Sequence, residues 1–169
     1  MSKRCVIGDI HGEVTQLILC LDKCKFDFYN DTLISLGDVV DRGVSSYECI
    51  ELLLKCKNFI GVRGNHDDCW FQYLKTGEQD VLWNQGGKET YFSYYNNDVS
   101  PEVHFKFFAD QVPFVIDEDN STIYNCAFLI SSPSSVFLSK HGCFLSVNAS
   151  NVIVSNCNLI PALIPASSK

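Results

Sequence analysis

Short apolar runs and segments with helical periodicity alternate along the first half of the chain. The apolar runs are rich in β-branched residues, and each is short enough to form one strand. They cover residues 3–8, 32–36 and 59–62. Helices are predicted at residues 13–24, from Ser45 or Ser46 to Cys56, and at 68–75. Alternation of this kind predicts right-handed βαβ units around a parallel sheet, and therefore an α/β fold.

The first two predicted helices each have one apolar face. Apolar residues recur there at intervals of three and four, which places them on the same side of a helix. The two faces consist of Val14, Leu17, Ile18 and Leu21, and of Ile50, Leu53 and Leu54. We expect both faces to be buried. The third helix is expected to stop at Gly77, because glycine readily closes a helix.

The charge pattern changes near residue 120. Residues 82–97 are aromatic and turn-rich, and 102–108 are predicted to form a short helix. Beyond residue 120 only Lys140 and Lys169 are charged. Ser, Asn and Pro turns separate predicted strands at 123–130, 136–138, 143–147 and 152–154.

Two regions follow from this change in composition. We expect a core over residues 1–120 and a divergent, weakly charged, serine-rich tail over 121–169. The tail either supplies the remaining strands of the same domain or is the product of a truncated or frameshifted gene.

A polar motif follows each of the three predicted strands. The motifs read GDIHG at 8–12, GDVVDRG at 37–43 and GNHD at 64–67. The loops after parallel strands gather at one edge of a sheet, and this edge is where α/β proteins bind ligands. We therefore expect Asp9, Asp38 and Asn65 to meet in one site, although 29 and 27 residues separate them along the chain.

One group of these side chains is suited to divalent cations. Asp9 and His11 are separated by one residue, so in an extended segment both side chains lie on the same side and can share an ion. Asp38 can bridge two ions with its two carboxylate oxygens, and Asn65 offers an amide oxygen to the second ion. Two metal ions held in this way are typical of sites that hydrolyse phosphate esters.

A second group of side chains is suited to proton transfer and anion binding. His66 directly follows Asn65 and is expected to act as a general acid that protonates a leaving oxygen. Asp41 is expected to hold the imidazole of His66 and to favour its charged form. Arg42 and Arg63 can each bind phosphate oxygens through paired, charge-assisted hydrogen bonds.

The composition of the chain makes several classes of protein improbable. The net charge is −7, without the basic stretch that a nucleic-acid-binding protein usually shows. No run of 18 apolar residues is present, so we expect no membrane-spanning helix. The nine cysteines are odd in number, form no CxxC pair and follow no secretory signal, which predicts reduced thiols in a cytoplasmic protein. A zinc site or a disulfide framework is the alternative.

The three motifs resemble the pattern GDxHG, GDxxDRG and GNH[DE] of the metal-dependent phosphoprotein phosphatases, which are calcineurin-like metallophosphoesterases. Over about residues 4–120 the chain is similar to the small bacterial and bacteriophage lambda-type serine/threonine protein phosphatases. The segment WNQGGKET at 83–90, with Ser93 and Tyr94 after it, contributes to this resemblance.

The resemblance implies a four-layer α/β/β/α sandwich and two divalent metal ions, commonly Mn²⁺. It implies metal ligation by Asp9, His11, Asp38 and Asn65, acid catalysis by His66 with Asp41, and phosphate contacts from Arg42 and Arg63.

The chain departs from the family pattern after residue 120. The family supplies two further histidines to the second metal ion, but Asn125 stands where the first is expected and no histidine follows His141. Either Asn125 or His141 is expected to complete the second site, which is predicted to bind metal weakly. His104 is expected on the surface of a helix.

The predicted function is metal-dependent hydrolysis of a phosphomonoester, with two-metal activation of water and His66 as the acid. The resemblance implies a protein serine/threonine phosphatase, whose substrate would be a phosphorylated protein or a small phosphoester. Symmetrical diadenosine-tetraphosphate hydrolases share the motifs and are one alternative. A catalytically impaired remnant that binds metal or phosphate is the other.

Overall fold

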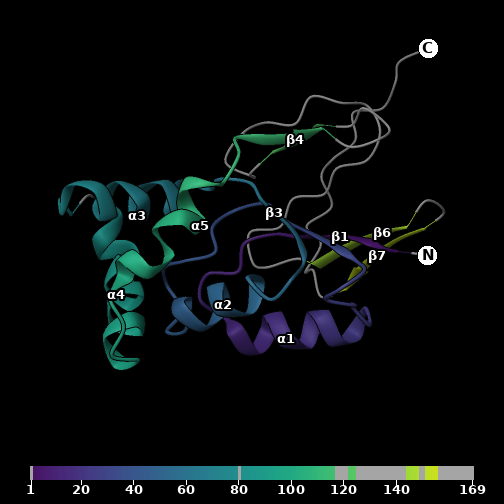
Figure 1. The fold of residues 1–169 in the computed structure, drawn as a ribbon, viewed down its shortest axis with the longest axis horizontal. Coiled ribbons are helices and arrows are strands. Elements are labelled where there is room, and N and C mark those ends of the chain that lie inside the picture. Colours follow the sequence, from purple (N-terminus) through teal and green to yellow (C-terminus); the bar gives the residue numbers. More distant parts are fainter. Residues whose placement is uncertain (1, 80, 117–121, 125–143, 149–150, 156–169) are drawn as a thin grey trace, which may run out of the picture.

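The α/β class is confirmed by a five-stranded sheet with helices packed beside it (Figure 1). The computed structural model describes residues 2–79, 81–116, 122–124, 144–148 and 151–155. The sheet has the order β3-β2-β1-β6-β7. Its strands are β1 (Arg4–Ile7), β2 (Thr32–Ser35), β3 (Asn58–Gly61), β6 (Phe144–Asn148) and β7 (Asn151–Ser155). The first three strands therefore lie where the sequence predicted them.

Strand direction divides this sheet into two parts. β1 pairs in parallel with β2, and β2 with β3, whereas β6 runs antiparallel to β1 and β7 antiparallel to β6. A second, two-stranded sheet joins β4 (Phe114–Ile116) to β5 (Thr122–Tyr124). The four-layer sandwich stays a prediction, as does the division of the chain at residue 120.

The first two helices cover the parallel strands on one side. In Figure 1, α1 (Val14–Lys23) and α2 (Ser46–Leu53) lie side by side beneath β1. Leu17, Leu21, Ile50 and Leu53 are buried in the main core, as predicted. Full burial of such a side chain contributes roughly 1.5–3 kcal/mol to stability.

Two residues of the predicted apolar faces are exposed. Ile18 is 43 % exposed, and Leu54, the residue after the last turn of α2, is 53 % exposed. The spacing of apolar residues identifies a helix, but it overestimates the width of the face that the sheet covers.

Helix α3 (Asn65–Thr76) begins three residues earlier than predicted. The Asp67 carboxylate accepts the backbone N–H of Gly64 at 3.4 Å, which satisfies a donor just before the first turn. Gly77 ends the helix with φ of +72°, as its sequence position predicted. The early start matters because it makes Asn65 and His66 part of a helical turn.

The aromatic segment after α3 contains a helix that the sequence analysis did not predict. A 3-10 turn, η1 (Val81–Gln85), leads into α4 (Gly87–Asn96). The face that α4 buries carries Thr90, Ser93 and Tyr94, two of which have only a small hydroxyl-bearing side chain. Because this face is polar, no apolar periodicity marks the helix. The predicted helix at 102–108 is present as η2 (Pro101–His104) and α5 (Phe105–Ala109).

The expectation for His104 was wrong. Its side chain is 2 % exposed and makes polar contacts with residues of two helices. Nδ1 lies 2.8 Å from the Tyr94 hydroxyl, and Nε2 lies 2.8 Å from Oε1 of Glu51. These two contacts supply the polar partners that a buried imidazole requires.

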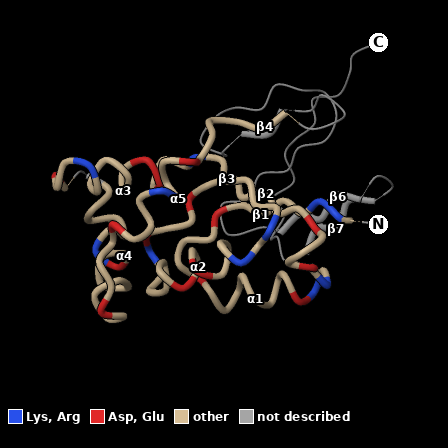
Figure 2. The backbone as a smooth tube through the Cα atoms, viewed as in Figure 1, with Lys and Arg blue, Asp and Glu red and all other residues tan. Residues whose placement is uncertain are grey.

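Three further properties of the described residues bear on the sequence predictions. Basic and acidic positions are interspersed along the backbone (Figure 2). In the described ranges no helix is both long and apolar enough to cross a membrane. Six of the described cysteines are reduced thiols, as predicted: Cys5, Cys20, Cys24, Cys49, Cys56 and Cys69. The other three lie outside the described residues.

Candidate active site

The three motifs meet at the ends of β1, β2 and β3. Hydrogen bonds between backbones join the first two loops: the N–H groups of Ile10 and His11 both donate to the Asp38 carbonyl, at 3.0 and 2.9 Å. The third loop is joined to the second by the His66 backbone N–H, which donates to Oδ1 of Asp38 at 3.0 Å. Asp38 thus contacts both other motifs, and the site forms at the predicted edge of the sheet.

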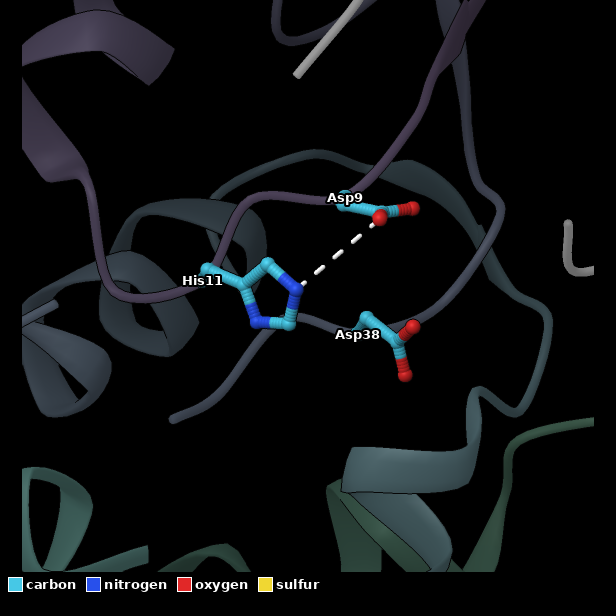
Figure 3. Close-up of side chains that lie close together, drawn as sticks. All are labelled: Asp9, His11 and Asp38. Atoms are coloured by element: carbon cyan, nitrogen blue, oxygen red, sulfur yellow. Dashed lines mark ion pairs between the residues drawn. The ribbon is translucent and has the colours of Figure 1, made fainter. Parts of the chain in front are cut away.

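Asp9, His11 and Asp38 form a group that could hold a metal ion. One potential ligand atom of each lies within 4.8 Å of the others. In Figure 3 the two carboxylates and the imidazole face a common space, and Oδ2 of Asp9 is 3.8 Å from Nε2 of His11.

The hydrogen bonding of His11 fits a metal ligand. Its Nδ1 lies 2.8 Å from the Val40 carbonyl, an acceptor only, so Nδ1 carries the proton and Nε2 has a free lone pair. Nε2 is buried and has no hydrogen-bond partner. Burial lowers the pKa of His11, which favours the neutral form that metals require. A cation among these three residues would supply the partner that Nε2 lacks.

The two carboxylates of this group also favour a cation. Burial raises the pKa of Asp9, and the nearby charge of Asp38 raises it further. Both effects show that the ionised form of Asp9 is poorly stabilised by water and by its neighbours. A divalent ion would reverse them.

Asn65 is the fourth predicted ligand, and it is exposed at the start of α3. The preceding Gly64 packs so closely on the second loop that a Cβ there would lie 2.1 Å from Oδ1 of Asp38. Only glycine can approach the second loop so closely. Gly64 before Asn65 and His66 after it therefore both lie next to the Asp38 carboxylate.

His66 and Asp41 form a buried pair, so the predicted contact between these two side chains is present, while their catalytic roles stay predictions. His66 Nδ1 lies 2.8 Å from Oδ2 of Asp41, and the two side chains are 3 % and 2 % exposed. Burial alone would lower the pKa of His66, but the hydrogen bond and the charge of Asp41 outweigh it and raise the pKa above its usual value. The imidazole ring lies edge to face with that of His11, with ring centres 4.9 Å apart.

Arg42 reaches the other side of the same imidazole. Its Nη2 lies 3.2 Å from Nε2 of His66. Arginine can only donate, so this contact corresponds to the neutral imidazole with a lone pair on Nε2. Protonation of Nε2 requires the guanidinium to turn away, and an anion that binds Arg42 would favour both changes.

The guanidinium of Arg63 has protein partners in this structure. Its Nη1 forms an ion pair with Oδ1 of Asp68 at 3.2 Å, and its Nη2 donates to the Phe108 carbonyl at 2.6 Å. The guanidinium also lies over the Phe71 ring, 4.6 Å from its centre. Binding of phosphate by Arg63 stays a prediction, and it would compete with these contacts.

Several site residues adopt a backbone conformation that most residues avoid. Positive φ angles occur at His11 (46°), Asp38 (51°), Asp41 (71°) and Arg42 (68°). Each such residue costs of the order of 1–3 kcal/mol and persists only where its surroundings hold it. This concentration of strain supports a functional role for the first two motif loops.

One residue in contact with the predicted acid pair was missed from the sequence. Thr90, on α4, has its hydroxyl oxygen 2.8 Å from both the backbone N and Oδ1 of Asp41. The only sequence signal was its place in the segment that resembles the phosphatases, since threonine within an aromatic stretch has no specific meaning by itself.

Either Asn125 or His141 is the residue expected to complete a second metal site. Asn125 and His141 both lie outside the described residues. Their roles stay predictions.

The family of the chain follows from its sequence match. The sequence model of the calcineurin-like phosphoesterase family matches residues 3–149, so the chain belongs to this family. That family typically binds divalent metals, in agreement with the group formed by Asp9, His11 and Asp38.

Three curated relatives illustrate the range of similarity. Serine/threonine-protein phosphatase 1 of Salmonella typhimurium is 39 % identical over 82 residues, which cover 48 % of this chain and 37 % of that protein. Serine/threonine-protein phosphatase 2 of Escherichia coli is 29 % identical over 79 % of this chain and 60 % of its own length. The symmetrical bis(5'-nucleosyl)-tetraphosphatase of Baumannia cicadellinicola is 45 % identical over 36 % of this chain and 22 % of its own length.

The chain therefore spans between about a fifth and three fifths of the relatives it matches. A solved structure described as a proposed diadenosine tetraphosphatase has a similar fold, with a TM-score of 0.50 and 24 % identity. The match covers 67 % of this chain and 44 % of the chain in that structure. At this identity the likeness concerns the fold alone.

Proposed function

We propose that the protein hydrolyses phosphomonoesters in a metal-dependent reaction, with phosphoserine or phosphothreonine in proteins as the substrate class. The observation that carries this proposal is the arrangement of His66. Its Nδ1 is held by buried Asp41, and its Nε2 lies beside Arg42. Its backbone N–H bonds the Asp38 carboxylate of the candidate metal group.

The metal ions would be held by the motif residues. Asp9, His11 and Asp38 would hold one divalent ion, and Asp38 and Asn65 a second, with Mn²⁺ as the proposed metal. When bound, such ions polarise phosphoryl oxygens and activate water for attack on phosphorus.

The protein side chains supply the remaining chemistry. Arg42 is exposed and can pair with two oxygens of the phosphoryl group. This interaction draws its guanidinium from Nε2 of His66, which can then carry a proton. As the bond from phosphorus to the leaving oxygen breaks, the proton on Nε2 passes to that oxygen. Asp41 holds Nδ1 throughout, so that the ring keeps one orientation.

The test compares substrates that differ in their need for an acid. The alkoxide of serine is a poor leaving group that needs a proton, whereas an aryl oxide leaves without one. His66→Asn should therefore lower kcat on a phosphoserine peptide by about 10²–10⁴-fold and on p-nitrophenyl phosphate far less. Equal losses on both substrates would show that His66 is a ligand or a structural residue.

A dinucleoside-polyphosphate hydrolase is the second candidate. The tetraphosphatase of Baumannia cicadellinicola is 45 % identical over 36 % of this chain, and this similarity supports the second candidate. Rates on a phosphoserine peptide and on diadenosine tetraphosphate, both with Mn²⁺, distinguish the two. Faster cleavage of the dinucleotide would replace the proposed substrate class.

Counting bound Mn²⁺ by mass spectrometry separates an active enzyme from a remnant. We expect one ion to be held by Asp9, His11 and Asp38. A second ion should bind only at millimolar concentrations of Mn²⁺. Activity that rises with millimolar Mn²⁺ would support the two-metal proposal. One tightly bound ion with no hydrolysis of any of the three substrates would show a metal-binding remnant.

A further inference from the structure

Thr90 is fully buried on α4, and its hydroxyl faces the loop after β2. The backbone N–H of Asp41 donates to Oγ1 of Thr90 at 2.8 Å. The same hydroxyl donates its proton to Oδ1 of Asp41, also at 2.8 Å. Ser46 Oγ lies 3.1 Å away and, since the Thr90 proton is already used, donates to Oγ1. The hydroxyl of Thr90 therefore uses its one donor and both acceptor positions.

These contacts divide the two oxygens of Asp41 between different partners. Oδ1 accepts from Thr90, and Oδ2 faces Nδ1 of His66 at 2.8 Å. With both oxygens engaged, the carboxylate cannot rotate without breaking a buried hydrogen bond. The orientation of the His66 imidazole, and with it the position of Nε2, depends on the orientation of the Asp41 carboxylate.

Thr90 also stabilises the backbone of Asp41. Asp41 has a φ angle of +71°, a conformation that is unfavourable for a residue with a side chain. Its N–H has Thr90 as its acceptor. Thr90 therefore acts on the conformation of Asp41 at two points, the backbone and the carboxylate.

We propose that Thr90 is a positioning residue for acid catalysis: it holds Asp41 and, through Asp41, the imidazole of His66. This inference rests on the proposed function, because it assigns Thr90 to the proton transfer described there. It predicts that the hydroxyl matters for substrates that need an acid and matters little for those that do not.

The experiment compares three substitutions on α4. Thr90→Val keeps the shape of the side chain and removes the hydroxyl, whereas Thr90→Ser keeps the hydroxyl. Ser93→Ala is the matched control, because Ser93 is also buried on α4 and bonds α2 through Tyr47 N–H and Glu48, without contacting Asp41.

The expected results differ between substrates. Thr90→Val should lower kcat on a phosphoserine peptide by about 10- to 100-fold, a part of what a complete general acid contributes, with KM almost unchanged. Its loss on p-nitrophenyl phosphate should be several-fold smaller. Thr90→Ser should restore most of the peptide rate, and Ser93→Ala should affect both substrates alike. A Thr90→Val variant that behaves like Ser93→Ala, or loses both activities equally, would overturn the proposal.

A second measurement does not depend on activity. In the metal-free protein, the proton shared by His66 Nδ1 and Asp41 should give a downfield proton NMR signal. Thr90→Val should shift or broaden it, and Thr90→Ser and Ser93→Ala should leave it in place. If the wild type hydrolyses no phosphomonoester, the proposed function fails, yet this signal still decides whether Thr90 positions His66. If Thr90→Val does not fold, Thr90→Ala replaces it, and failure of both would show that Thr90 serves only folding.

Discussion

Among the candidate metal ligands, Asp38 connects the second motif loop to both the first and the third. Its carbonyl accepts two N–H groups of the first loop, and its Oδ1 accepts the N–H of His66. Its charge also helps to raise the pKa of Asp9, after burial, and the pKa of Asp67, which burial and Asp38 together bring to about 7. Asp38 thus stabilises the loops through its oxygens and destabilises the metal-free site through its charge.

Replacing that charge should separate the two effects. Asp38→Asn keeps an oxygen that can accept the His66 N–H but removes repulsion from Asp9. We expect the metal-free variant at pH 7 to be as stable as the wild type or more stable, by up to about 1 kcal/mol. The basis is that one pKa unit corresponds to 1.36 kcal/mol and the shift at Asp9 has several causes. Chemical denaturation with a chelator present measures the difference.

The same substitution should weaken metal binding strongly. Mn²⁺ titration followed by calorimetry should show the loss, because the amide lacks the charge and one ligand oxygen. Wild-type stoichiometry and affinity in Asp38→Asn would contradict a role for Asp38 as a ligand.

At the scale of elements, α4 is held against the loop after β2 by a close approach of backbones. Gly86, which precedes α4, has a φ angle of +128°, and a Cβ there would lie 2.2 Å from the Arg42 backbone N. Its carbonyl lies within hydrogen-bond distance of the same N–H, at 3.4 Å. This approach brings Thr90 to Asp41, so the position of α4 affects the positions of Asp41 and of His66, which Asp41 contacts.

Gly86→Ala should separate α4 from this loop. The strained φ angle alone costs about 1–3 kcal/mol, and the clash with Arg42 adds to that cost. We expect a lower melting temperature and, where protein remains folded, a large loss of activity on phosphoserine peptides. Gly87→Ala is the control, because its Cβ would meet neighbours only at ordinary distances of 3.5 Å or more. Equal stability of the two variants would show that the approach at Gly86 is not required.

The turn between α1 and β2 is tied to the start of β1 through Asp31. Its carboxylate accepts the backbone N–H groups of Lys3 and Asp27, at 2.7 and 2.9 Å. Burial opposes ionisation, but these hydrogen bonds and the Lys3 ammonium outweigh it and lower the pKa of Asp31 below its ordinary value of 3.8. The ionised carboxylate therefore stabilises the fold.

The pH dependence of this contribution has a definite sign. Because the folded pKa is lower than the unfolded one, the stabilisation is complete above pH 3.8 and is lost as the pH falls through the folded pKa. Asp31→Asn should lower the free energy of unfolding at pH 7 by about 1–3 kcal/mol and flatten its slope below pH 4. Urea denaturation at several pH values measures both. Asp22→Asn, at an exposed position of α1, should change neither.

At the scale of the whole molecule, β1 lies inside the sheet because β6 pairs with it. Arg4 to Ile7 pair on one side with β2 and on the other with residues 144–147. Without β6, β1 would be an edge strand with unpaired N–H and C=O groups. The tail thus contributes to the sheet that carries the first motif.

Removal of the tail tests this arrangement. In a chain that ends at residue 143, the β1 amides that bond β6 should exchange with deuterium faster than in the full chain. The amides of β2, Thr32–Ser35, should change less, because β2 keeps both neighbours, and the shortened chain should also associate more readily. Unchanged exchange in β1 would show that the tail is independent of the core, in favour of the expected boundary at residue 120.

Much of the local structure could be predicted because it depends on neighbours in the sequence. The strands near Val6, Ile34 and Ile60 are apolar and β-branched, and the polar motifs follow directly after them. The pairing of Asp9 with His11 could be expected from their spacing of one residue. Since parallel strands bring their following loops together, the pairing of Asp41 with His66 could also be expected without coordinates.

What the tertiary structure alone decided is which polar groups become partners across long separations. Thr90 lies 49 residues from Asp41, and Glu51 lies 53 residues from His104, so no local pattern links either pair. For the same reason the sequence could suggest that Arg63 binds an anion but not that the carbonyl of Phe108, 45 residues away, would engage it. Periodicity records burial along one element, whereas a hydrogen bond depends on where a second element lies, and packing of the whole chain determines that.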